Sequence, residues 1–155
     1  MDLRVTVEVV TREQWGAVAP RCWDTLTCPA QRVVIHHTAL LHCGGIRECI
    51  DQLIHIQTMH MQDRNFDDIG YNFLAFAAFL LGEIAQCIGA NGFRFSVSDQ
   101  SPSPAALSSV KQLLQCGVSQ GHLHPGFTLH GHRDLGDTEC PGDGLYAALK
   151  HLKFP

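Results

Sequence analysis

The sequence predicts an α/β fold, a β-sheet covered by helices, from three observations. Short apolar segments rich in β-branched or aromatic residues alternate along the chain with longer segments of helical periodicity. The longest apolar run, residues 73–81, has nine residues, against the roughly 20 that span a bilayer, and suits a buried strand or strand pair. With 155 residues the chain is long enough for one packed domain and too short for two ordinary ones. Alternating strands and helices then predict a single sheet packed against helices.

The first half of the chain contains a strand, a long helix and a second strand region. Residues 32–38 are rich in β-branched side chains, which predicts a strand. Apolar residues recur near the helical period over residues 46–61, so this segment is predicted as the first long helix. Residues 67–70 form a turn, and from Tyr71 we expect a strand that continues into the apolar run.

A further strand and helix follow. Residues 93–97 alternate apolar and polar side chains, as a half-buried strand does. Ser103 offers a capping hydroxyl before a proline at the first helical position, so residues 104–116 are predicted as a helix that Gly117 ends. Its inward-facing residues are expected to be Leu107, Val110, Leu113 and Leu114.

The C-terminal part is predicted to hold a short strand, a loop and a last helix. Residues 127–129 form the strand and residues 143–152 the helix. We take residues 1–10 as an N-terminal segment and residues 11–155 as a single domain. The last helix is expected to bury Leu145, Tyr146, Leu149 and Leu152.

The charge pattern excludes some partners. Fifteen acidic against eleven basic residues give a net charge of -4, and no run of Lys or Arg would follow a phosphate backbone, so nucleic acid is not expected as a partner. Residues 1–4 lack the charged and apolar regions of a secretion signal, and no segment has the length of a transmembrane helix. Most of the ten histidines, His60 included, are expected to be ordinary surface or packing residues.

The seven cysteines are an odd number, so one remains after pairing. Cys43 and Cys49 bracket a five-residue loop that contains glycine, and we favour a small disulfide there, which implies an oxidising compartment. The alternative is that all seven are reduced and buried, since free cysteine is among the most buried residue types. If Cys140 binds a metal, six remain.

Two histidines and a cysteine indicate a metal site. His132 and Cys140 lie eight residues apart in a turn-rich loop, and His36 and His37 end the first predicted strand. Successive strand residues point to opposite faces, so only one of that pair reaches the site. Two imidazoles and one thiolate make a three-ligand zinc set with an open fourth position, the catalytic arrangement. Such a zinc lowers the pKa of its bound water to about 7.

Neighbouring residues have both functional and plainer interpretations. Tyr71 and Thr138 are hydroxyl donors that suit a developing oxyanion, or a packed tyrosine and a turn-capping threonine. Arg133 and Asp134 either orient the His132 imidazole or form an ordinary surface ion pair. A lone strand histidine is usually a hydrogen-bonded core residue, and Glu139 is expected to face solvent.

Taken together, these segments resemble the peptidoglycan recognition proteins and the phage-type zinc N-acetylmuramoyl-L-alanine amidases similar to them. The resemblance runs in the same order from about Thr11 to the C-terminus, which is more specific than any single motif. The matching segments are residues 15–16, 34–38, 43–49, 68–73, 116–118, 131–134 and 138–142.

The resemblance implies a central mixed β-sheet flanked by three main α-helices, with a groove for the stem peptide and muramic acid of bacterial peptidoglycan. In amidase members, zinc is held by the residues matching His36, His132 and Cys140. The residues matching Tyr71 and Thr138 assist at the oxyanion. The implied reaction is cleavage between N-acetylmuramic acid and L-alanine. Members that only bind often carry serine where this chain has Cys140.

The chain departs from the family in residues 75–90, which are shorter and more apolar than the usual hairpin and groove segment. Several residues that contact the stem peptide are therefore absent, and a preference for lysine-type or diaminopimelate-type wall is not assigned. Cys22 lacks its usual partner, because Asp67 stands there, and Cys116 lacks its N-terminal partner. New pairings of these two with Cys28 and Cys87 stay open.

Family members are mostly secreted, so the resemblance implies an extracellular, antibacterial protein of innate immunity. The missing signal then indicates a domain excised from a longer precursor or an incomplete gene model. Three readings follow for the site. The first is a zinc amidase, the second a recognition module that binds wall fragments without cleavage, and the third a structural zinc or a disulfide-bonded Cys140.

Overall fold

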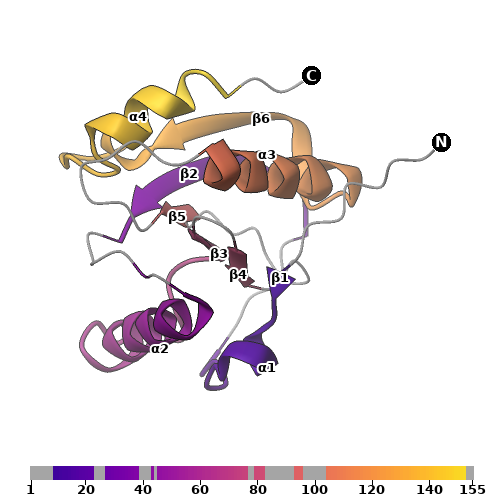
Figure 1. The fold of residues 1–155 in the computed structure, drawn as a ribbon. Helices are drawn as coiled ribbons and strands as arrows, with labels where there is room; N and C mark the ends of the chain where they lie inside the picture. Colours follow the sequence, from indigo (N-terminus) through magenta and orange to yellow (C-terminus); the bar gives the residue numbers. More distant parts are fainter. Residues whose placement is uncertain are drawn as a thin grey trace.

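A computed structural model of the chain describes residues 9–22, 27–38, 43, 45–76, 79–82, 93–95 and 104–152. A six-stranded sheet with strand order β1-β4-β3-β5-β2-β6 forms its centre (Figure 1). β3 and β4 pair antiparallel and all other neighbours pair parallel, so the sheet is mixed, as predicted. The strands are β1 (Val9–Val10), β2 (Ala30–His37), β3 (Phe73–Phe76), β4 (Phe79–Gly82), β5 (Phe93–Phe95) and β6 (Leu123–Gly131).

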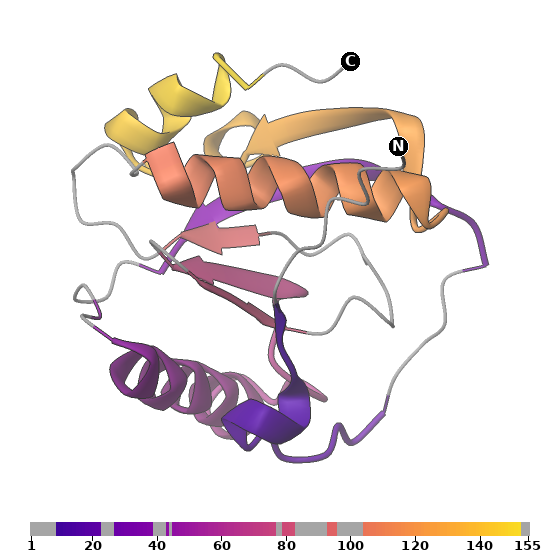
Figure 2. The same ribbon diagram turned by 45° about the vertical axis from the view of Figure 1, so that its right-hand side comes forward.

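Helices cover both faces of this sheet. α1 and α2 lie on one side and α3 and α4 on the other, as Figures 1 and 2 show. The three main helices confirm the predicted fold class. None of the helices in the described part of the chain combines the length and hydropathy of a membrane span. The helices are α1 (Arg12–Trp15), α2 (Ile46–Gln62), α3 (Pro104–Ser119) and α4 (Asp143–Leu149), with a 3-10 turn η1 (His132–Asp134).

Two separate apolar cores hold the layers together, and β3 shows how the sheet divides them. Phe73 and Leu74 are adjacent and both are nearly inaccessible, but they belong to different cores because successive strand residues face opposite sides. Phe73 packs in the core of α3 and α4, whose largest members include Ile35, Leu114, Leu123 and Leu145. Leu74 packs in the core of α1 and α2 with Trp15, Cys43, Cys49, Leu53 and Ile56.

The predicted elements of the first half are confirmed, with small differences at their ends. Residues 32–37 of the predicted strand belong to β2, which begins at Ala30 and ends at His37, and residues 46–61 belong to α2. The apolar run forms a strand pair, β3 and β4, which is one of the two arrangements predicted for it, and β3 begins at Phe73 rather than at Tyr71. Within the prediction for residues 93–97, β5 covers Phe93–Phe95, and residues 96–97 lie outside the described part.

The predicted end of α3 at Gly117 is wrong, because the helix continues to Ser119. Glycine is tolerated inside a helix when packing offsets its cost, and the next residue, Val118, packs against the core. The helix is instead stopped by Gly121, whose φ of 79° is left-handed. Of the predicted inward residues, Val110, Leu113 and Leu114 are buried and Leu107 is partly exposed. Ser103 lies outside the described residues.

Two C-terminal predictions also differ in length. β6 begins at Leu123, before the predicted residues 127–129, because the strand continues through a register shift against β2 between Ala30 and Arg32, and Pro125 in this irregular stretch is tolerated on an edge strand. α4 ends at Leu149 rather than at residue 152. Leu145 and Leu149 are buried as predicted, whereas Tyr146 and Leu152 are only partly buried.

The predicted disulfide between Cys43 and Cys49 is present and ties the segment before α2 to its first turn. Cys22, Cys28 and Cys116 carry thiols without a disulfide in the described structure. Cys87 lies outside the described residues. Cys140 is a buried thiol, so the reading of a disulfide-bonded Cys140 is contradicted.

Replacing both Cys43 and Cys49 by alanine is expected to lower the free energy of unfolding by about 2 kcal/mol, because the bridge restricts a short loop in the unfolded chain. Urea denaturation measures the difference. Cys22→Ala, which removes an exposed thiol, is the matched control and should leave the urea midpoint unchanged. An unchanged midpoint in the double variant would contradict the prediction.

Candidate metal centre

His36 lies at the end of β2 on the sheet face that carries α2. Ile35 points into the opposite core, so alternation places the His36 ring on the face where Tyr71 packs. The centroids of the His36 and Tyr71 rings are 5.8 Å apart. His37 has the other orientation, and its ring lies beside Gly142 at the start of α4. The structure therefore selects His36 over His37 as the candidate ligand.

His132 is brought to His36 by strand pairing. β6 runs parallel to β2 with Gly131 opposite Ile35, so the residues that follow each of these leave the same edge of the sheet. The centroids of the two imidazole rings are 4.3 Å apart. Cys140 lies at the end of the loop that follows η1, and it is 7% exposed.

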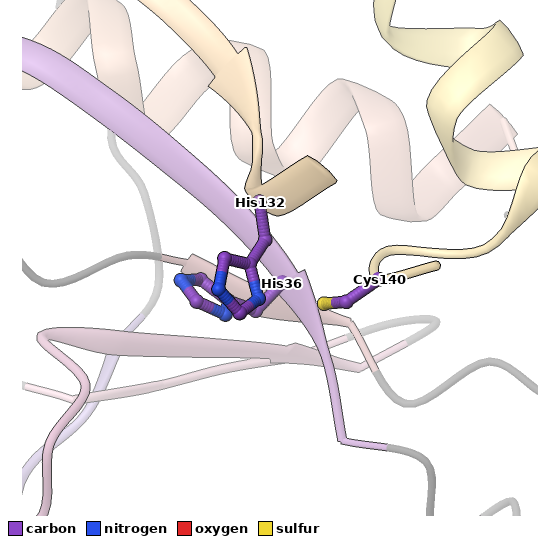
Figure 3. A group of neighbouring side chains, drawn as sticks. All are labelled: His36, His132 and Cys140. Carbon is purple, nitrogen blue, oxygen red and sulfur yellow. The ribbon is translucent and has the colours of Figure 1, made fainter. Parts of the chain in front are cut away.

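The three predicted ligands form one cluster, drawn in Figure 3 with the two imidazole rings side by side and the sulfur of Cys140 directed toward them. The ligand atoms of His36, His132 and Cys140 all lie within 4.8 Å of one another. Tetrahedral zinc with N and S ligands places them about 3.5 Å apart, so a small inward movement completes the set. The backbone N–H of His37 donates to the Cys140 sulfur at 3.3 Å, and an ionised sulfur accepts such a bond more strongly than a thiol. This donor set fits zinc.

Tyr71 and Thr138 lie beside the ligands. The Cys140 N–H donates to the Thr138 hydroxyl oxygen at 3.1 Å, which is the turn-capping contact of the plainer interpretation. A hydroxyl that accepts one bond still has its own proton to donate. Glu139 is exposed, as expected.

His60 is a packing residue, as the sequence suggested, but it packs against Tyr71, a candidate site residue. Its ring is 3% exposed and lies 5.1 Å from the Tyr71 ring, centroid to centroid. Its Nδ1 accepts the Gly70 N–H at 2.9 Å, which fixes the turn that leads into Tyr71. The helical periodicity of residues 46–61 puts His60 on the inward face of α2, so the sequence contains a signal for this packing position.

Asp134 and Arg133 form hydrogen bonds with the backbone and with α4, and in the described structure neither is hydrogen-bonded to the His132 ring. The Asp134 carboxylate accepts the Gly131 N–H at 2.9 Å and the Tyr146 hydroxyl. The Tyr146 hydrogen bond is the main cause that lowers the pKa of Asp134, and the same bond raises the pKa of Tyr146. A Cβ at position 131 would lie 2.7 Å from the Tyr146 ring, so this close approach requires glycine. The sequence indicated Tyr146 only as a core residue.

Comparison with known proteins supports the resemblance noted in the sequence. No family-level sequence profile matches the chain. The chain is 33% identical to peptidoglycan recognition protein 1 of Bos taurus over 92% of this chain and 82% of that protein. The solved structure of Drosophila PGRP-SD has a TM-score of 0.86 at 31% identity and covers 95% of both chains. PGRP-LE in complex with tracheal cytotoxin, a monomeric diaminopimelic acid-type peptidoglycan, has a TM-score of 0.86 at 26% identity over 93% of each chain.

The mixed sheet, its three main helices and the histidine–cysteine cluster define an α/β domain with a candidate metal centre. The chain belongs to the peptidoglycan recognition protein family. This family has both amidase and non-catalytic members. The choice between them rests on the site.

Proposed function

We propose that this protein is a zinc-dependent N-acetylmuramoyl-L-alanine amidase that hydrolyses the amide between muramic acid and L-alanine in bacterial peptidoglycan. The observation that carries the proposal is the cluster of His36, His132 and Cys140, with all ligand atoms within 4.8 Å of one another. Three protein ligands leave a fourth position open, as catalytic zinc sites do. Family membership supports the substrate class.

The residues around the cluster suit amide hydrolysis. Zinc held by this set supplies a Lewis acid and an activated water at neutral pH. Attack on the amide carbonyl develops negative charge on its oxygen, and preorganised donors stabilise that charge. In this proposal the Tyr71 hydroxyl donates to the oxygen, and the Thr138 hydroxyl, held next to Cys140 by the backbone, is the second donor.

Peptidoglycan as the ligand is supported by the family and by the relatives whose structures hold tracheal cytotoxin. The disulfide between Cys43 and Cys49 supports an oxidising location. We infer that the protein acts outside the cell against bacterial wall fragments, as an antibacterial component of innate immunity.

The test measures zinc content and release of free stem peptide from muramyl peptide together, on purified protein with and without a chelator. The expected result is about one zinc per chain and release that the chelator abolishes and added zinc restores. Release that survives complete removal of zinc would contradict the mechanism. Stoichiometric zinc without release would overturn the assignment as an amidase.

A recognition module that binds without cleaving is the second candidate. It is favoured by the altered segment of residues 75–90, where the chain departs from the groove pattern of the resemblance. Only part of that segment, residues 75–76 and 79–82, lies in the described structure, as β3 and β4. Binding of muramyl peptide without any release of stem peptide would identify this function.

A further inference from the structure

The loop that carries two of the three candidate ligands is held mainly by polar contacts. Residues 134–137 and Glu139 are exposed, so little apolar burial fixes the path of the chain from His132 to Cys140. His36, in contrast, is fixed by its strand. The distance between His132 and Cys140 therefore depends on whatever closes this loop.

Arg133 makes the contacts that close it. Its backbone N–H donates to the Cys140 carbonyl at 2.8 Å. Its guanidinium donates from Nη2 to the Glu139 carbonyl and from Nη1 to the Asp143 carboxylate, at 2.9 Å for the second bond. The same group lies over the Tyr146 ring, 4.6 Å from the centroid. One residue next to His132 thus contacts the chain on both sides of the peptide bond that leads into Cys140.

We propose that Arg133 is a positioning residue that sets the spacing of the His132 and Cys140 ligands, an inference that rests on the proposed zinc site. Arginine suits this role because its planar fork directs separate donors at two acceptors in fixed geometry, which a lysine ammonium does not reproduce. The ion pair with Asp143 contributes little, because that carboxylate is 99% exposed. The carbonyl contact and the aromatic platform provide the constraint.

The buried Nε of Arg133 supports this interpretation. It has no hydrogen-bond partner in the described structure, although leaving a buried donor unsatisfied is unfavourable. An arginine side chain held by no other contact would turn its Nε toward water. Here the guanidinium is held in the orientation that serves the Glu139 carbonyl.

The test compares zinc affinity of the full chain, measured by competition with a chromogenic chelator, between the parent and Arg133→Lys and Arg133→Met. Both variants are expected to bind zinc about tenfold or more weakly, as when a residue supporting a metal ligand is removed. Lys150→Met is the matched control. Lys150 also places its cation over the Tyr146 ring, at 5.0 Å from the centroid, and this variant should stay within about twofold of the parent.

Thermal unfolding of the metal-free proteins separates positioning from general stability. Arg133→Lys keeps the charge and carries the test if Arg133→Met fails to fold. Zinc affinity of folded Arg133→Lys within about twofold of the parent would overturn the inference and leave the proposed function intact. A parent that binds no zinc would overturn both, so the two failures are distinguishable.

Discussion

Cys140→Ser is expected to abolish hydrolysis of muramyl peptide while sparing its binding. A serine hydroxyl is neutral at pH 7 and is a much poorer zinc ligand than a thiolate. A bound metal ion contributes several kcal/mol to the transition state, so its loss is expected to lower kcat about 10³-fold or more. Zinc content should fall well below one per chain. Stem-peptide release and binding of muramyl peptide, measured on the same sample, check the prediction.

Cys28→Ser is the matched control for this substitution. It makes the same change of thiol to hydroxyl at an exposed position on the segment before β2, and both zinc content and release should match the parent. If Cys140→Ser retained release close to the parent rate, the zinc amidase mechanism would be wrong. If it lost binding as well as release, the cysteine would have a structural role that the proposal does not include.

The candidate ligand cluster was predictable because each part is local. His132 and Cys140 lie in one short loop, and the strand signal around Ile35 places an imidazole at a sheet edge. The strand pattern alone did not choose between His36 and His37, because either face of the alternation is consistent with it, and only the family resemblance indicated His36. In the structure the choice is decided by which face of β2 joins the core of α3 and α4, where Ile35 is buried together with residues distant in sequence such as Val110.

The same distinction explains the errors in the fold. α2 and α3 have strong periodic patterns, so their existence was predicted correctly, as were three of the four inward residues of α3, Val110, Leu113 and Leu114. The extension of α3 past Gly117 and the early start of β6 depend on burial of Val118 and Leu123 against other elements, which no local signal records. The contacts of Arg133 with Glu139 and Tyr146 are of this kind too. The first depends on the path of the loop between His132 and Cys140, and the second on the position of α4, which carries Tyr146.

Tyr71→Phe is expected to lower kcat by about 10² to 10³, with little change in KM, because it removes one donor to the developing oxyanion and retains the ring. The ring is needed for packing, since it lies 5.8 Å from the His36 ring and 5.1 Å from the His60 ring, centroid to centroid. Zinc affinity should therefore equal that of the parent. Steady-state release of stem peptide and chelator competition measure the two quantities separately.

Comparison with Tyr71→Ala shows whether the hydroxyl or the ring is responsible. If Tyr71 acts only by packing, Tyr71→Phe should behave as the parent and Tyr71→Ala alone should lose activity and zinc affinity. If the hydroxyl stabilises the oxyanion, most of the loss in kcat should already be present in Tyr71→Phe, while its zinc affinity is unchanged. A parent-like kcat in Tyr71→Phe would remove Tyr71 from the proposed mechanism and leave Thr138 as the donor to test next, because its hydroxyl is held beside Cys140.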